Sequence, residues 1–322
     1  MPLLICFLAL LVALSIDRWW GEPRARLHPV VWMGDYLGWT GRWLQRQAHQ
    51  DPKQRDWKAF WLAALVWCLG AAGICLAFWF LHSVALALPW WASVLMLGFF
   101  LKPMLAWAML KSEVQAVEAA LADSLPAGRE RLRWLVSRDV QQLSETEVRE
   151  SAIETLAENL NDSVVAPIFW FVLLGLPGAA LYRFANTADA MWGYPGMYQG
   201  CNWMWAGKWA ARADDALSYV PARLTAVLLL LAAGVRGLKL APQLRMEADK
   251  TPSPNSGWPM AAIALVSGVE LRKPGVYVLN PQGRIVEPAD TALSIALASK
   301  SLIWLLAIVG VATIFMLIWW TP

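Results

Sequence analysis

The sequence predicts an all-α integral membrane protein with about four clear transmembrane helices. Further broken or re-entrant helices are expected to line a polar cavity that faces the cytoplasm. Three observations support this fold class. Of the 322 residues 58% are hydrophobic and only 16% are charged, whereas soluble domains carry about 25% charged residues. The 22 tryptophans suit a protein with many aromatic side chains at a lipid boundary. Long apolar runs alternate with segments rich in lysine and arginine, which disfavours an ordinary soluble enzyme.

Four apolar runs are candidate spans, for which about 20 apolar residues are needed. Pro2 to Ile16 is shorter, but it lacks the basic start and cleavage site of a signal peptide, so we expect an uncleaved first segment. Trp57 to Leu81 and Leu88 to Leu110 follow, separated by a short turn around His82 to Leu86. Ala292 to Trp320 is the clearest span and ends in a tryptophan pair.

Two further runs, Val164 to Phe184 and Tyr219 to Val235, are interrupted by helix-breaking or charged residues. Irregular backbone at membrane depth is tolerated where it lines a polar cavity or is buried in protein. We therefore expect both runs to be broken or re-entrant helices rather than independent lipid-facing spans. The interrupting residues are Pro167, Pro177, Gly178, Pro221 and Arg223.

Basic residues collect in three stretches, which the positive-inside rule places in the cytoplasm. The expected cytoplasmic loops cover about residues 17–58, 111–162 and 236–290 of a single polytopic domain, 1–322, with both termini on the opposite side. The formal net charge is +3 and the basic residues do not run together, so no nucleic-acid partner is indicated. The four cysteines show no CxxC spacing and the three histidines are scattered, so any metal here would need oxygen ligands.

The densest polar chemistry lies in Ser144 to Asp162, which opens with a capping-box pair, Ser144 and Glu147, and is expected to be a helix. Glu154, Glu158 and Asp162 recur every four residues and share one face. Like charges next to an apolar segment need a counter-ion, and Mg²⁺ with a phosphate substrate would supply one. A solvated acidic helix face is the alternative interpretation.

A second polar group follows the first interrupted run. Arg183, Asn186 and Asp189 recur every three residues, so a cation, an amide and a carboxylate would face one way on a helix. The alternative is helix capping at a membrane interface. The nearby pair Asp214 and Asp215 is a weak signal by itself, because such pairs are common on surfaces.

Two turn-like segments add weaker candidates. His28 lies beside Pro29 just after the first apolar run, where a histidine is more often structural than catalytic. The loop Ser253 to Gly257 contains small and amide residues that could approach a phosphate, although such loops are also ordinary turns. The sequence has no P-loop and no GxGxxG or GxSxG motif.

Taken together, these segments resemble the adenosylcobinamide-phosphate synthase family, CobD/CbiB, over almost the whole chain. The resemblance has departures: Glu22, Ser137 and Ala190 replace a usual Asp, Gly and Ser, and Arg183 and Lys273 replace a usual Lys and Gly. The matching residues are Asp17, Gly21, Pro23 and His28-Pro29-Val30; Arg138-Asp139; Glu154, Glu158, Asn159, Asp162, Ala166 and Pro167; Asn186, Thr187, Asp189, Met191, Gly193 and Tyr194; Arg212, Asp214, Asp215, Pro221, Ala222 and Arg223; and Ser253 to Asn255 with Tyr277.

The resemblance implies an ATP-dependent amide synthase of the bacterial inner membrane, with its active site facing the cytoplasm. It would join adenosylcobyric acid to aminopropanol phosphate or ethanolamine phosphate, using ATP and Mg²⁺. Membrane lipids and other late cobalamin-pathway membrane enzymes are expected partners. The implied catalytic residues are Glu154, Glu158, Asp189, Asp214, Asp215 and Arg212; the implied substrate- or phosphate-binding residues are Arg138, Asp139, Arg183, Asn159, Asn186, Thr187, Arg223, His28, Ser253 and Asn255; and the implied metal ligands are Glu154, Glu158, Asp162 and Asp189.

Two other functions remain open from the sequence. A non-catalytic membrane signalling protein of the AmpE type would keep the helices but not the carboxylate motifs. A corrinoid carrier or transporter would also use broken helices with charges at membrane depth.

Overall fold

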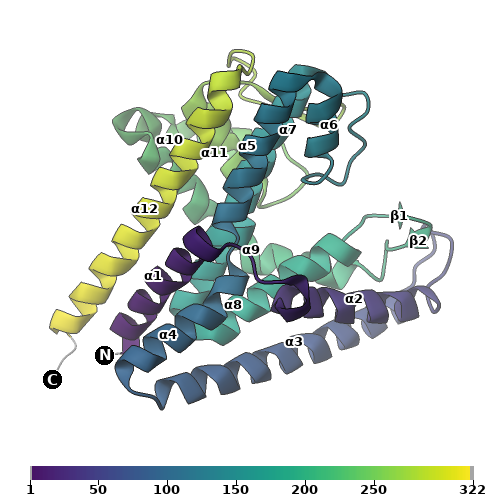
Figure 1. The fold of residues 1–322 in the computed structure, drawn as a ribbon. Helices are drawn as coiled ribbons and strands as arrows, with labels where there is room; N and C mark the ends of the chain where they lie inside the picture. Colours follow the sequence, from purple (N-terminus) through teal and green to yellow (C-terminus); the bar gives the residue numbers. More distant parts are fainter. Residues whose placement is uncertain (1, 320–322) are drawn as a thin grey trace. The chain divides into compact units, whose positions relative to one another are not determined.

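The computed structural model describes residues 2–319, which fold almost entirely into helices (Figure 1). By their internal contacts these residues divide into two compact units. Unit 1 comprises residues 2–105 and 166–218, and unit 2 comprises residues 106–165 and 219–319. The single polytopic domain expected from the sequence stays a prediction.

Unit 1 is built on long helices that pack lengthwise. Helix α1 packs on α4, and α3 runs beside α2 and α8 (Figure 1). Its elements are α1 (Pro2–Trp20), η1 (Ala25–Leu27), α2 (Pro29–Gln45), α3 (Trp57–Leu86), α4 (Trp90–Leu101), η2 (Lys102–Met104), α8 (Ala166–Trp192), the two-residue strands β1 (Met197–Tyr198) and β2 (Cys201–Asn202), and the first part of α9 (Lys208–Ala232).

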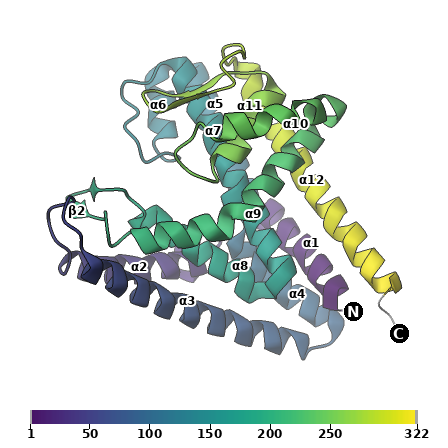
Figure 2. The same cartoon turned by 180° about the vertical axis from the view of Figure 1, so that it is seen from behind.

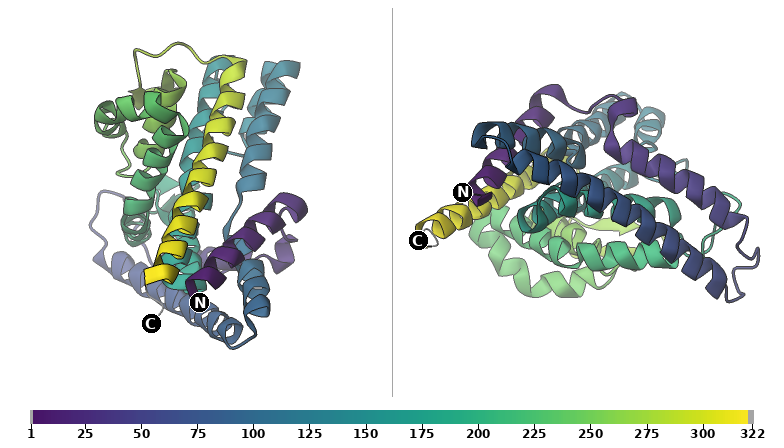
Figure 3. Two further views of the ribbon diagram at one scale, coloured as in Figure 1. Left: turned by 90° about the vertical axis from the view of Figure 1, so that its left-hand side faces the viewer. Right: turned by 90° about the horizontal axis from the view of Figure 1, so that it is seen from below.

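Unit 2 surrounds one buried helix, α7. This helix contacts α5, α6, α11 and α12, and α10 packs against α11 (Figure 2). Helix α12 runs along α7 and α5 (Figure 3). The elements are α5 (Trp107–Asp123), α6 (Leu125–Leu132), α7 (Glu145–Leu160), the π-helical turn η3 (Asn161–Val165), the rest of α9, α10 (Gly234–Ala248), α11 (Gly257–Ser267), the antiparallel strands β3 (Leu271–Lys273) and β4 (Tyr277–Leu279), and α12 (Pro288–Trp319).

The predicted fold class is confirmed. Six helical segments of the described chain are long and apolar enough to cross a membrane, as expected for a multi-pass membrane protein. They are Leu3–Trp20, Trp57–Leu86, Trp90–Asp123, Glu145–Trp192, Lys208–Ala232 and Pro288–Trp319. The second tryptophan of the expected C-terminal pair, Trp320, lies outside the described residues.

The predicted span Leu88 to Leu110 overlaps the candidate span Trp90–Asp123, but its helix is interrupted. Leu88 to Leu110 is not a continuous helix, because α4 ends at Leu101 and α5 begins only at Trp107. The break contains Lys102 and Pro103, and the lysine side chain leaves the apolar run to pair with acids of unit 1. The turn expected around His82 to Leu86 is helical, and the chain reverses at residues 87–89 instead.

The first interrupted run is broken, as expected, but at a glycine. Gly175 adopts φ 67° and ψ −157° inside α8, two residues before Pro177. Glycine adopts this positive φ readily, because it has no Cβ atom. Pro177 has no backbone N–H, so it cannot donate the helical hydrogen bond to the carbonyl four residues earlier. Whether α8 crosses the membrane or re-enters stays a prediction.

The expected break at Pro221 is wrong, because α9 continues through it from Lys208 to Ala232. A proline at this position leaves the carbonyl four residues earlier without its helical donor. The Trp170 indole donates to that carbonyl, on Leu217, at 3.0 Å. Tertiary hydrogen bonding therefore replaces the bond that the proline removes.

Candidate active site

Helix α7 begins where its sequence predicts but ends two residues before the expected Asp162. The Ser144 hydroxyl accepts from the Glu147 amide, and the Glu147 carboxylate accepts from the Ser144 amide at 2.7 Å, which completes the capping box. Regular α-helix ends at Leu160 and passes into the π-helical turn η3. Two of the predicted acids, Glu154 and Glu158, therefore lie one turn apart on a buried helix.

These two acids line a cavity of about 180 Å³ in unit 2. Glu154 is only 5% exposed, and its nearest guanidinium nitrogen, Nη2 of Arg138, lies 3.8 Å away. Arg138 also donates to the Ser151 hydroxyl. The remaining lining comes from Leu135, Val136, Ser137, Thr155, Asn159, Lys273 and Tyr277.

The β3–β4 hairpin closes this cavity with residues from far along the chain. Lys273 pairs with Tyr277 across the two strands. The preceding residue, Arg272, contacts the fully buried Glu150 at 3.2 Å and so attaches the hairpin to α7. Burial raises the pKa of Tyr277, and a hydrogen bond to the negative Glu154 raises it further. The phenol therefore stays protonated and donates.

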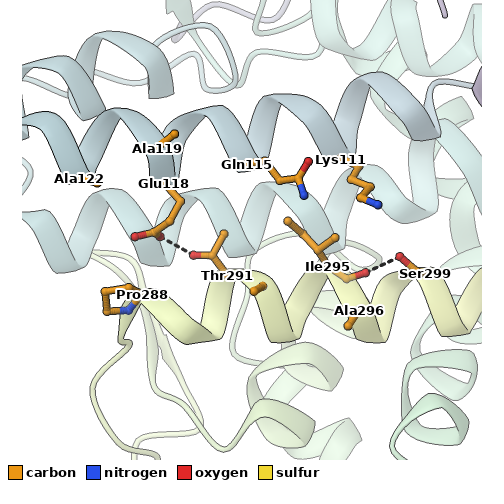
Figure 4. Close-up of a pocket in the computed structure, with 11 residues that line it drawn as sticks. Lys111, Gln115, Glu118, Ala119, Ala122, Pro288, Thr291, Ile295, Ala296 and Ser299 are labelled. Carbon is orange, nitrogen blue, oxygen red and sulfur yellow. Dashed lines mark hydrogen bonds between the residues drawn. The ribbon is translucent and has the colours of Figure 1, made fainter.

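A second ionic network fixes α7 from its other side. Arg149 pairs with Glu118 of α5 at 2.8 Å and with Glu145 at 3.0 Å. Thr291 of α12 donates to the same Glu118 at 2.6 Å. Figure 4 shows this contact within a groove of about 750 Å³ between α5 and α12. The network thus joins α5, α7 and α12 to one another.

In unit 1 the structure brings the second polar group together with Asp214 of the nearby acidic pair. Arg183 donates to Asn186 at 3.4 Å within α8, and Asn186 donates to Asp214 of α9 at 3.5 Å. The Thr187 hydroxyl donates to the Arg183 carbonyl at 2.7 Å. The expectation that Arg183 and Asn186 share a face is confirmed. Asp215 is half-buried and Arg212 is exposed on the same helix, α9.

Asp189 is held against the start of the loop that follows α8. A Cβ atom at Gly193 would lie 1.9 Å from Asp189 Oδ1, so the carboxylate occupies the space that a side chain would need. Burial, a hydrogen bond with Tyr198 and the charge of Asp189 all raise the pKa of Tyr194. The rings of Tyr194 and Tyr198 stack with their centroids 3.6 Å apart.

Several other predicted site residues have structural contacts of their own. His28 caps α2, since its Nδ1 accepts from the Val30 amide, and its Nε2 faces Glu22 at 3.1 Å. Asp139 is exposed and accepts from the Gln141 amide, outside the 180 Å³ cavity. Asp162 accepts from Asn161 at 2.8 Å within η3.

Arg223 organises the loop that contains Ser253 and Asn255. Its guanidinium donates to Asn255 Oδ1 at 3.0 Å and to the Pro254 carbonyl at 3.3 Å, and it lies over the Tyr219 ring at 3.5 Å. The Ser253 hydroxyl accepts from the amides of Asn255 and Ser256, each at 3.2 Å. A phosphate role for this loop stays a prediction.

The sequence interpretation missed three charged or polar positions. Lys102 is 1% exposed and lies 3.3 Å from Asp17 and 2.7 Å from Glu22. The sequence did offer one indication of this position, a single lysine inside an apolar run, because a charged residue in such a run is usually paired or functional. Lys273 and Tyr277 were noticed only as family positions, because nothing local in the sequence links them to α7.

Comparison with known proteins identifies the family of the chain. The family described as CobD/Cbib protein matches residues 10–319. The chain belongs to the CobD/CbiB family. It is 38% identical over 276 residues to a probable cobalamin biosynthesis protein CobD of Methanothermobacter thermautotrophicus, covering 84% of this chain and 86% of the relative. It is 41% identical over 268 residues to the Thermococcus kodakarensis protein of the same name, covering 83% of each. It is 32% identical over 322 residues to cobalamin biosynthesis protein CobD of Dehalococcoides mccartyi, covering 97% of this chain and 98% of the relative.

Membership of the CobD/CbiB family supports a role in cobalamin biosynthesis. No solved structure is significantly similar to the chain. Within residues 2–319, no three His, Cys, Asp or Glu side chains gather closely enough to hold a metal ion. The metal and nucleotide assignments made from the sequence therefore stay predictions.

Proposed function

We propose that this CobD/CbiB family member is an adenosylcobinamide-phosphate synthase. It would use ATP to form an amide between a propionate carboxylate of adenosylcobyric acid and the amine of aminopropanol phosphate or ethanolamine phosphate. The observation that supports an enzyme best is the cavity beside α7, where Glu154 and Glu158 lie with Arg138. A purely structural helix would not need to bury an acid beside an open polar cavity.

The residues of this cavity match the demands of amide formation. The attacking amine must lose a proton, and Glu154 and Glu158 are the carboxylates placed to accept it. Negative charge moves among phosphate oxygens during carboxylate activation, and Arg138 is a suitable partner for it. The protonated Tyr277 adds a neutral donor at the same cavity.

The residues do not fit a magnesium ion held by protein ligands alone. Glu154 already faces Arg138, and the charge of Lys273 also acts on it, so a divalent cation there would meet two positive neighbours. Mg²⁺ usually keeps several waters and binds through one or two carboxylates plus substrate phosphates. We therefore propose that magnesium arrives with ATP and neutralises its phosphate charge, and we assign it no further protein geometry.

The polar cluster of unit 1 is the second part of the proposal. Asp189, Asp214 and Asp215, with Arg183 and the exposed Arg212, would serve ATP or the corrinoid carboxylate. This requires the loop after α8 to face the cytoplasm, the side of the membrane on which Glu158 of α7 is expected to lie. Cysteine labelling at Gln199 tests it: in a background without native cysteines, an impermeant reagent should label only permeabilised cells, and labelling of intact cells would refute the arrangement.

The function is tested with the full chain purified in detergent. ATP consumption should depend on both adenosylcobyric acid and aminopropanol phosphate, and the amide product should appear with it. Glu158→Gln should lower turnover by about 10²- to 10⁴-fold, the range for an acid–base group. The matched control is Glu130→Gln, because Glu130 is an exposed acid of the same unit and should be silent. Corrinoid binding without ATP turnover would instead identify a carrier or transporter.

A further inference from the structure

Helix α10 begins directly after an apolar helix that can cross a membrane. That helix, α9, is one of the six candidate spans, and a single residue, Ala233, separates it from α10. At about 3.6 Å per residue, the connection is shorter than about 8 Å. Gly234 adopts φ 67°, a conformation that glycine tolerates and that turns the chain at this point. The start of α10 therefore lies close to the place where α9 leaves the apolar layer.

The two faces of α10 have different surroundings. The helix packs against α11, and its buried side chains include Leu244 and Ala248 (Figure 2). On the other face Val235, Leu238 and Met246 are 72%, 50% and 64% exposed. At 3.6 residues per turn, these three side chains fall within about 80° of one another around the helix. They form an apolar stripe that no other part of the described chain covers.

Three basic residues border this stripe. Arg236, Lys239 and Arg245 are all exposed. Within residues 2–319 their ion pairing is limited to Arg245 with Asp249, at 3.7 Å, and both of these side chains are mostly exposed. Such surface pairs contribute little. Glu247, the one acid in the sequence of α10, is buried. The exposed face of α10 therefore combines an apolar stripe with a positive charge.

We propose that this basic and apolar face of α10 lies on the cytoplasmic leaflet of the membrane and binds anionic phospholipids. A helix with an apolar stripe and basic flanks lies in the interface plane, with its apolar side chains at the acyl boundary and its cations among the phosphates. Residues 236–290 are expected on the cytoplasmic side, where the membrane surface is negative. The assignment does not depend on the proposed function.

The position of α10 along the chain favours lipid over a protein partner. The headgroup layer on each side of the hydrocarbon core is about 5–7 Å thick. Because α10 starts within about 8 Å of the end of α9, its first turn meets headgroups without any association step. Each basic side chain near an anionic leaflet should raise the affinity for anionic lipid about fivefold. Since α11 packs on both α10 and α7, the lipid contact would also support the helix next to α7.

Lipid contact can be measured on the full chain in nanodiscs. Leu238→Cys and Met246→Cys, each in a background without the native cysteines, would carry a bimane fluorophore. The discs would contain phospholipid with a nitroxide near the headgroup end of an acyl chain. Bimane at both positions should be quenched. The matched control is Glu130→Cys, at an exposed position of α6 in the same unit, and it should stay bright. Absence of quenching at Leu238→Cys and Met246→Cys would overturn the membrane contact.

The preference for anionic lipid is tested by changing the labelled lipid. At equal mole fraction, nitroxide phosphatidylglycerol should quench Met246→Cys bimane more strongly than nitroxide phosphatidylcholine, and adding Lys239→Gln should lower the relative affinity for phosphatidylglycerol about fivefold. The control Arg133→Gln removes an exposed cation at the end of α6 and should leave this affinity unchanged. Equal quenching by the two lipids before any charge is removed would overturn the anionic assignment. A disulfide-linked dimer of Met246→Cys without lipid quenching would assign the face to a second copy of the chain, and would also overturn it.

Discussion

Replacing Lys102 by methionine should destabilise unit 1 by about 3–5 kcal/mol, the cost of breaking a buried ion pair from one side. Lys102 and Asp17 are each 1% exposed, and the Lys102 ammonium lies 3.3 Å from Asp17 and 2.7 Å from Glu22. Methionine keeps most of the aliphatic stem, so the loss is electrostatic rather than steric. The folding equilibrium should fall by roughly two to four powers of ten.

The measurement is unfolding in mixed micelles by increasing SDS fraction, followed by tryptophan fluorescence. Adding Asp17→Asn to Lys102→Met is the informative control, because it removes one of the two acids that lose their counter-charge and should recover part of the lost stability. A lysine variant within about 1 kcal/mol of wild type would show that the pair behaves as a solvated surface pair, and would refute the reasoning.

Four further predictions concern other parts of the molecule. Gly193→Ala should lower turnover at least tenfold, measured in the amide assay, because the new methyl group would occupy the place of the Asp189 carboxylate. Trp170→Phe should cost about 1–3 kcal/mol in the SDS titration, since the Leu217 carbonyl loses its donor. Burial alone would raise the pKa of Glu22, but hydrogen bonds from His28 and Lys102 hold it below its ordinary 4.5. Its stabilising contribution is therefore full above that value and is lost as the pH falls through the lowered pKa; Glu22→Gln should remove this part of the acid sensitivity. Chelating magnesium with EDTA should abolish turnover in the amide assay, because magnesium is proposed to enter with ATP, and full turnover in EDTA would contradict that proposal.

Features encoded locally were predictable from the sequence. The start of α7 depends on Ser144 and Glu147, three residues apart, and both hydrogen bonds form as the pattern indicates. The shared face of Arg183 and Asn186 likewise follows from helical periodicity. Such contacts require only that the helix exists.

Features that depend on distant partners were not predictable. Pro221 was expected to break a helix, but Trp170, which lies 47 residues before Leu217, donates the missing hydrogen bond to the Leu217 carbonyl. Hydropathy averaged over a long window concealed Lys102, whose partners lie in the first 22 residues. Lys273 and Tyr277 reach Glu154 only because β3 and β4 pair and attach to α7.

The pairing of Lys102 with Asp17 also constrains how the protein is made. Its two members are 85 residues apart, the difference between positions 102 and 17. At about 5–20 residues per second, the ribosome needs roughly 4–17 s to supply the lysine after the aspartate. A charged residue at the centre of an inserting helix costs about 2.5–3.5 kcal/mol, whereas a residue near its end can stay at the interface. Asp17 lies in the last turn of α1, so this helix can enter the membrane early and keep its acid at the surface until η2, directly after α4, arrives with the counter-charge.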